Sequence, residues 1–180
     1  SATGDRLTMS VNLSPRQLAE PSLPNDVARI LHESGVPPEC VWLEITESTL
    51  MRDAESAMSA LGALRALGLH LAVDDFGSGY SSLAYLERLP VEVLKVDRSF
   101  VQGVGQRADS TAIATAIVSL ARALGLRSVA EGIETVEQLT ELRNVGCEMG
   151  QGYLFGAAQP AAEYGDDPFE TVPAWGLLGI

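Results

Sequence analysis

Short runs rich in Val, Ile and Leu alternate with longer amphipathic segments along most of this chain, and this alternation sharply limits the folds open to it. Short β-branched runs are typical of buried strands, whereas apolar residues three and four positions apart are typical of helices. Six strands are expected, at residues 7–13, 41–46, 69–75, 91–97, 127–133 and 149–155. Strands and helices in alternation predict an α/β fold of about six βα units around a parallel sheet.

Helices are expected between these strands, at residues 23–34, 53–68, 110–125 and 135–146. Gly35 and Gly68 stand at the ends of the first two, where a left-handed residue commonly stops a helix. Thr135 and Gln138 have the spacing of a capping box, which predicts the start of the last helix. The pattern is lost near the end of the chain. One domain over residues 1–164, followed by a C-terminal tail over residues 165–180, is therefore predicted.

The composition excludes one class of partner. The chain has 24 Asp and Glu against 12 Lys and Arg, and its net charge is −12. Binding to a DNA or RNA polymer depends on clustered Lys and Arg that replace phosphate counterions, so such a polymer is not expected as a partner. Cys40 and Cys147 form no CxxC pair or disulfide framework, which favours a reducing compartment. With no membrane span or leader expected, the prediction is a cytoplasmic domain, or the cytosolic part of a larger membrane-attached protein.

Polar side chains fall at or near the C-terminal ends of all the expected strands. In parallel βα architectures, and above all in the βα barrel, these ends meet at one mouth, where active sites are built. The candidate residues are Asn12, Glu44, Asp74, Asp75, Lys95, Asp97, Glu131 and Gln151. Their common position predicts a functional site.

Each of these residues also has an interpretation without function. Asn12 is of a type common in turns, and Asp75 precedes a glycine-rich stretch that would make an ordinary turn. Glu44 lies between apolar neighbours and could pair with a buried arginine. Lys95 could lie along a sheet edge with its ammonium reaching water, or form a structural ion pair with Asp97 on the same side of the strand. A shared position at every strand end favours a site over these separate explanations.

The residue types at this mouth indicate a metal site. Carboxylate and amide oxygens, without His or Cys, are the ligands that hard cations such as Mg²⁺ and Mn²⁺ prefer. Asp74 and Asp75 could direct one carboxylate to each of two ions, and two ions about 3.5–4 Å apart can clamp a phosphoryl group and activate a water. His70 begins its strand at the opposite end and His32 lies in a helix, so neither is expected at the site.

Six blocks of the sequence together resemble the EAL-domain family of cyclic di-GMP phosphodiesterases, bacterial enzymes of second-messenger signal transduction with a modified βα barrel. The blocks occur in the family's order and cover most of residues 11–156. They read VNLSPRQL, LEITES, DDFGSGYSSL, LKVDRSFV, AEGIET and GCEMGQGYLFG. The resemblance implies a partial (βα)8 barrel of EAL type. It also implies a hydrolase in which a metal-activated water opens one phosphodiester of cyclic di-GMP and gives the linear dinucleotide.

The resemblance also implies the roles of the oxygen ligands. Asn12, Glu44 and Asp74 would hold one ion, Mg²⁺ or Mn²⁺. Asp74, Asp75 and Glu131 would hold the second. Glu131 has a competing role as general base, which the sequence does not separate from that of a ligand.

Further roles follow from the same resemblance. Lys95 would contact the bridging water or the attacked phosphate, with Asp97 beside it. Glu47 would anchor the loop that follows the aspartate pair. Gln151 would line the substrate cleft.

Two departures from the family pattern shape the expectation for this chain. The Glu-Ala-Leu motif that names the family has no counterpart, and the EVL at residues 92–94 belongs to a different block. The resemblance therefore implies that a metal-ligating Glu, a phosphate-binding Arg and about two strands of the eight-stranded barrel are missing. The chain alone is accordingly expected to be a weak enzyme or an inactive one. Residues 157–160 read AAQP where the family commonly has a basic residue and Pro, which leaves the role of that loop open.

Two functions remain open at this point. The retained metal and catalytic positions favour a cyclic di-GMP phosphodiesterase. The alternative is a catalytically inactive EAL-like module that binds the dinucleotide or a protein. Attached sensory or GGDEF domains are expected in the full protein, no membrane contact is expected from this domain, and a homodimer is left open.

Overall fold

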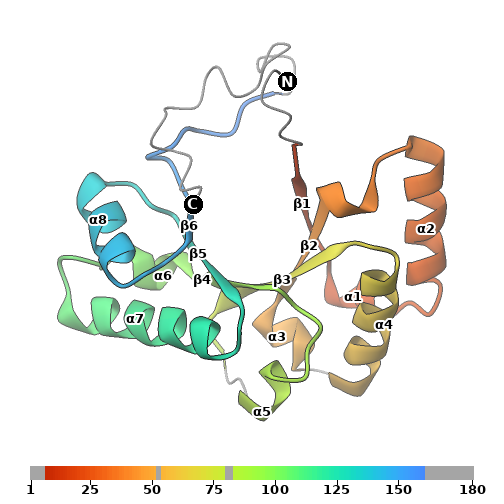
Figure 1. Ribbon diagram of the computed structural model, residues 1–180, viewed down its shortest axis with the longest axis horizontal. Helices are drawn as coiled ribbons and strands as arrows, with labels where there is room; N and C mark the ends of the chain where they lie inside the picture. Colours follow the sequence, from red (N-terminus) through yellow and green to blue (C-terminus); the bar gives the residue numbers. More distant parts are fainter. Residues whose placement is uncertain (1–6, 52–53, 80–82, 161–180) are drawn as a thin grey trace. The chain divides into compact units, whose positions relative to one another are not determined.

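Figure 1 shows the computed structural model of the chain, which describes residues 7–51, 54–79 and 83–160. The chain divides into two compact units, and the division falls between Leu94 and Lys95. Of the described residues, those up to 94 form the first unit and those from 95 onward form the second. The predicted domain end at residue 164 and the predicted tail lie outside the described residues.

In the first unit, strands alternate with helices as the sequence pattern predicts. The hydrogen-bonded order of its strands is β1-β2-β3-β4, and β1, β2 and β3 are parallel. β4 begins in this unit and ends in the second. The elements are β1 (Met9–Asn12), α1 (Pro15–Leu18), α2 (Leu23–Ser34), η1 (Pro38–Cys40), β2 (Val41–Thr46), α3 (Glu47–Leu50), α4 (Ala54–Ala66), β3 (His70–Phe76), α5 (Leu83–Leu86) and β4 (Val93–Val96).

The core of the first unit is formed by apolar residues of its strands and of α4. Ile45 of β2, Leu71 of β3, and Leu61 and Leu64 of α4 are fully buried. Leu61 and Leu64 lie three positions apart, and therefore on one helix face. Burying each such side chain contributes about 1.5–3 kcal/mol. This packing fixes β2 and β3, and with them the polar residues that these strands carry.

β1 is the edge strand of this unit. All four of its residues are exposed, and Met9 and Val11 are exposed to 68% and 45%. Within the part of the chain that the structure describes, β1 pairs with β2 alone. The side chains of β1 are therefore open to solvent on both faces.

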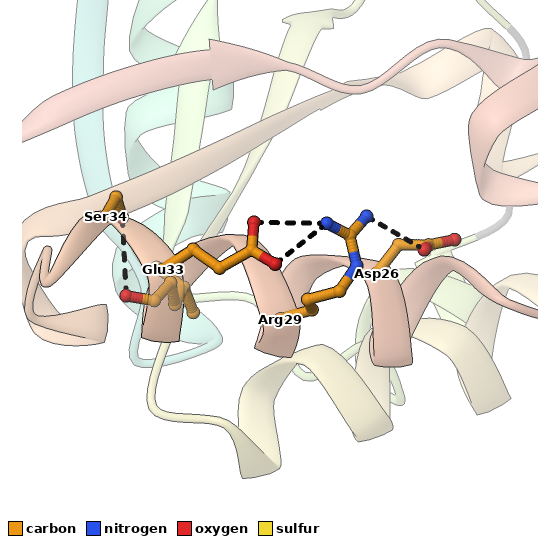
Figure 2. Close-up of polar contacts among 5 residues, drawn as sticks. Asp26, Arg29, Glu33 and Ser34 are labelled. Carbon is orange, nitrogen blue, oxygen red and sulfur yellow. Dashed lines mark hydrogen bonds and ion pairs between the residues drawn. The ribbon is translucent and has the colours of Figure 1, made fainter.

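Helix α2 carries ordinary surface interactions on its outer side (Figure 2). Arg29 Nη1 lies 3.2 Å from Glu33 Oε2, and Arg29 Nη2 lies 3.4 Å from Asp26 Oδ1. The side chains of these residues are more than half exposed. Exposed pairs of this kind contribute about 0.2–1 kcal/mol each. The helix ends at Gly35, whose φ of 68° lies in the left-handed region, as the sequence predicts.

The second unit continues the alternation. The hydrogen-bonded order of its strands is β4-β5-β6, and β5 and β6 are parallel. Helices α7 and α8 lie side by side next to β5 (Figure 1). Apolar residues of these elements, among them Ala121, Ala130 and Leu142, are at most 1% exposed. Besides the end of β4, the elements are α6 (Arg98–Val101), α7 (Ala108–Ala123), β5 (Arg127–Glu131), α8 (Val136–Asn144) and β6 (Met149–Gln151).

All six predicted strands are present, although four of them are shorter than predicted. The predicted capping box is confirmed, because Thr135 accepts from the Gln138 backbone N–H and the Gln138 side chain reaches back to Thr135. Helix α7 begins at Ala108, earlier than the predicted residue 110, without a side-chain cap at Arg107. Among the described residues, no helix combines the length and the apolar character needed to cross a bilayer.

Candidate functional site

The aspartate pair lies near the end of β3, in the first unit. Val73 and Phe76 around the pair are 1% and 5% exposed, and Asp74 itself is 9% exposed. Asp74 and Asp75 each offer a carboxylate oxygen, and these two oxygens lie within 4.8 Å of each other. Two carboxylates this close in a largely apolar setting disfavour each other's charge unless a cation lies near them. The end of β3 therefore suits a cation.

The backbone of Asp75 brings the pair together. Neighbouring residues of a regular strand point to opposite faces. Asp75 has a φ of 53°, the one positive value among the described residues other than glycine. Its carbonyl accepts hydrogen bonds from the Ser78 hydroxyl at 2.8 Å and from the Ser78 N–H at 3.4 Å. The turn interrupts the alternation of the strand, so the two carboxylates can approach each other.

The strand register brings three predicted ligands to one face of the first unit. Asn12 of β1 is in register with Glu44 of β2, and Glu44 is in register with Ala72 of β3. Asp74 lies two residues beyond Ala72, and alternate residues of a strand share a face. Asn12 is exposed, whereas Glu44 is 9% exposed and flanked by the buried Leu43 and Ile45. An amide and two carboxylates therefore lie on one face of three adjacent strands.

Glu47 reaches the loop that follows the aspartate pair. It is the first residue of α3, directly after β2, and is 2% exposed. Its Oε2 accepts hydrogen bonds from the Gly77 N–H at 2.8 Å and from the Gly79 N–H at 3.4 Å. A Cβ atom added at Gly79 would lie 3.1 Å from Glu47 Oε1. A side chain at that position would therefore press against the carboxylate.

Lys95 and Glu131 form a largely buried ion pair in the second unit. Lys95 Nζ lies 2.6 Å from Glu131 Oε1, and the two side chains are 5% and 17% exposed. Leu94 and Val96, next to Lys95 in the sequence, are fully buried. The interpretation of Lys95 as an edge residue that reaches water is therefore wrong. The opposite charge of Glu131 offsets the cost of burying Lys95, and the pair holds the Lys95 side chain at the end of β4.

Asp97 directly follows β4, and Gln151 is at the end of β6. Asp97 follows β4 and caps α6, because its Oδ1 accepts from the Ser99 N–H at 2.7 Å and from the Ser99 hydroxyl. Gln151 is the last residue of β6, in register with Glu131 of β5. Its side chain is exposed. Asp97 and Gln151 therefore lie at the carboxyl ends of their strands, as Lys95 and Glu131 do.

Arg98 and Glu134, for which the sequence predicts no role, are paired in the structure. Arg98 Nη2 donates to Glu134 Oε1 at 2.7 Å. Arg98 follows Asp97 directly, and Glu134 lies three residues after Glu131. In the sequence, Arg98 and Glu134 carry opposite charges and lie just beyond the site residues Asp97 and Glu131. This placement was the signal that could have suggested the pair.

The acidic strand ends suit a metal, and the histidines and cysteines lie elsewhere. His70 begins β3, where its Nδ1 lies 2.5 Å from Glu92 Oε2. Burial raises the pKa of the Cys147 thiol, against the lowering effect of its hydrogen bonds to Ser128 and Met149. The candidate metal ligands of the first unit, which are Asn12, Glu44, Asp74 and Asp75, offer only oxygen atoms. Oxygen ligands are those that a hard cation prefers.

The comparisons with known proteins name a family. Residues 2–158 match the EAL domain. The cyclic di-GMP phosphodiesterase NbdA of Pseudomonas aeruginosa is 44% identical over 158 residues, which are 88% of this chain and 20% of NbdA. The bifunctional diguanylate cyclase/cyclic di-GMP phosphodiesterase MucR of the same organism is 44% identical over 155 residues, which are 86% of this chain and 23% of MucR. The chain thus spans about a fifth of the length of these relatives.

Solved structures show the same fold. The MucR phosphodiesterase in complex with c-di-GMP has a TM-score of 0.84 at 44% identity, covering 87% of this chain and 63% of that chain. BlrP1 of Klebsiella pneumoniae, in a manganese/cy-diGMP complex, has a TM-score of 0.77 at 34% identity, covering 83% of this chain and 38% of that chain. These likenesses confirm the predicted fold class, a partial barrel of EAL type.

Proposed function

The chain belongs to the EAL domain family, and on this premise we propose that it is the catalytic region of a metal-dependent phosphodiesterase that hydrolyses cyclic di-GMP to the linear dinucleotide. NbdA and MucR are named as cyclic di-GMP phosphodiesterases, which supports this hydrolase role. The MucR and BlrP1 structures are complexes with that dinucleotide, and the BlrP1 complex contains manganese. The proposal extends these properties to this chain.

The observation that carries the proposal is the shared face of Asn12, Glu44 and Asp74. We assign these three residues to one Mg²⁺ or Mn²⁺ ion, because their oxygens are of the type that such ions prefer. We assign Asp74, Asp75 and Glu131 to a second ion. Two ions of this kind supply, when bound, Lewis acidity toward a phosphodiester and a water of lowered pKa.

The other site residues act on the substrate and on the geometry of the site. Lys95 stabilises the negative charge that grows on the phosphate oxygens, because its ammonium is already desolvated and held by Glu131. Glu131 is assigned as a ligand of the second ion, and its competing role is to accept the proton of the attacking water. Asp97 fixes the segment after Lys95, and Gln151 lines the cleft for the dinucleotide.

The reaction needs no covalent intermediate on the protein. The water oxygen bonds to phosphorus while one ester P–O bond breaks on the opposite side. The released oxygen takes up a proton, and the ring opens to a linear dinucleotide with a terminal phosphate. Glu47 contributes by fixing, through the Gly77 and Gly79 amides, the loop that follows Asp75.

The setting of this activity is also proposed. MucR combines a phosphodiesterase with a diguanylate cyclase, and a similar attachment of GGDEF or sensory domains fits a chain that matches a fifth of its relatives. The substrate is a bacterial second messenger, which fits the cytoplasmic side predicted from the cysteines.

The test is hydrolysis of cyclic di-GMP by the intact natural protein with Mn²⁺ or Mg²⁺, followed by chromatography of the nucleotides, with the 180-residue chain assayed beside it. We expect the linear dinucleotide as the product, no turnover after chelation, and weak or no turnover by the chain alone. Binding of cyclic di-GMP without turnover by the intact protein would establish the inactive receptor instead. Absence of both binding and turnover would refute the proposal.

A further inference from the structure

We propose that Arg98 is a positioning residue that holds Glu131 against Lys95 through a set of side chains beside the ion pair. These side chains, here called the clasp, are Arg98, Gln102, Glu134 and Gln138. The inference rests on the proposed function, because it gives the Lys95–Glu131 pair a part in hydrolysis. The clasp connects the segment that follows β4 to the segment that follows β5.

The exposed side of the clasp is an ion pair with a second acceptor. Arg98 Nη2 lies 2.7 Å from Glu134 Oε1, with side chains 54% and 40% exposed. With its amide oxygen turned toward the guanidinium, Gln102 would accept from Arg98 Nε at 2.9 Å and from Nη2 at 3.1 Å. One planar guanidinium therefore joins α6 to the loop that follows β5.

The buried side of the clasp is Gln138, which is 5% exposed. Its Oε1 accepts from the Glu134 N–H at 2.8 Å and from the Thr135 N–H at 3.0 Å. Its Nε2 donates to the Gln102 carbonyl at 3.3 Å. The same two segments are thus joined twice, once by the exposed guanidinium and once by the buried amide.

Arg98 also lies directly against the residue that follows Glu131. Gly132 has a φ of 70°, and a Cβ atom added there would lie 2.4 Å from Arg98 Cγ. The aliphatic part of Arg98 therefore occupies the space beside the Gly132 backbone. A shift of Arg98 acts on Gly132 first, and Glu131 is covalently next to it.

The position of the clasp along the chain explains its effect on the ion pair. Lys95 lies three residues before Arg98, and Glu131 lies three residues before Glu134. The spacing of the two segments therefore sets the 2.6 Å distance between Lys95 Nζ and Glu131 Oε1. A misplacement of about 1 Å at a reacting group can cost about 100-fold in rate, whereas an exposed ion pair contributes little to folding. Loss of Arg98 should thus lower the rate more than the stability.

The test compares Arg98→Gln and Glu134→Gln with wild type in the intact protein, using cyclic di-GMP and Mn²⁺. We expect kcat to fall by about 10- to 100-fold, with KM and the midpoint of thermal unfolding nearly unchanged. Arg98→Lys keeps the charge but not the planar fork, and should recover part of kcat. Arg29→Gln on α2 is the matched control, because Arg29 forms exposed ion pairs far from these segments in sequence (Figure 2) and should leave kcat unchanged.

A second readout does not depend on metal or turnover. Amide hydrogen exchange over residues 131–135, measured without metal, should be faster in Arg98→Gln and Glu134→Gln than in wild type, and unchanged in Arg29→Gln. Unchanged exchange in both clasp variants, or a kcat within about twofold of wild type, would overturn the inference. If the wild type does not hydrolyse cyclic di-GMP, the proposed function fails by itself, and hydrogen exchange still decides whether the clasp fixes this segment.

Discussion

Replacing Glu47 by alanine removes the acceptor that holds the loop after the aspartate pair. Glu47 is 2% exposed, and its Oε2 accepts from the amides of Gly77 at 2.8 Å and Gly79 at 3.4 Å. Alanine has no atom that could replace this carboxylate. The loop should therefore lose its tie to α3, and Asp75, directly before it, should lose its fixed backbone conformation.

The expected loss of stability follows from these bonds. A hydrogen bond to a charged group contributes about 1.5–3 kcal/mol to stability. The 2.8 Å bond to Gly77 is well formed, whereas the 3.4 Å bond to Gly79 is long, so the first should dominate. We expect Glu47→Ala to lower the free energy of unfolding by about 2–3 kcal/mol. In a domain of this size, that change lowers the midpoint of thermal unfolding by about 4–12 °C.

Urea denaturation, with hydrogen exchange at Gly77 and Gly79, measures both effects. Glu47→Gln should lower the free energy of unfolding by about half as much as Glu47→Ala, because neutral hydrogen bonds are roughly half as strong as charge-assisted ones. Glu33→Ala, on the exposed side of α2, is the control and should change the free energy of unfolding by less than about 0.5 kcal/mol. A Glu47→Ala variant with the stability of that control, and with slow exchange at both glycines, would refute the reasoning.

Other predictions follow from the second unit. Lys95→Ala should lower kcat far more than it weakens cyclic di-GMP binding, because the ammonium acts mainly on charge that develops in the transition state. A large rise in Kd with unchanged kcat would instead give Lys95 a binding role. Burial raises the pKa of the Cys147 thiol, so the unfolded state loses this proton first as the pH rises. The stabilising contribution is therefore complete below the unfolded pKa of about 8.5 and is lost as the pH rises from that value through the higher folded pKa. Urea unfolding across this range should show a weaker pH dependence in Cys147→Ala, and an equal dependence in both proteins would contradict the assignment.

The strands were predictable because their apolar runs are buried in the sheet. Residues 41–46 were predicted and observed as β2, and Ile45 within them is fully buried. Helices α1, α3, α5 and α6 were missed, because four residues are too few to show a helical period. The early start of α7 was not predictable, because the residue before it, Arg107, makes no capping hydrogen bond with its side chain.

The candidate residues were predictable by position, but their partners were not. The carboxyl ends of strands in a parallel βα fold meet at one mouth, which is why Asn12 and Glu44 were predicted to belong to one site. The partner of Lys95 depends on tertiary packing: the sequence suggested the nearby Asp97, and the structure shows an ion pair with the distant Glu131. Arg98 was overlooked for the same reason, because its partner Glu134 lies on a different segment.

Turnover of cyclic di-GMP by an Asp74→Asn variant of the intact protein tests the central claim most directly. We propose Asp74 as a ligand shared by both ions, so its loss should leave neither ion correctly placed. Product formation with saturating Mn²⁺ should be undetectable, although the variant should unfold at the same temperature as wild type. Asp26→Asn on α2 is the control and should retain full turnover. Turnover by Asp74→Asn close to that of wild type would contradict the two-metal account.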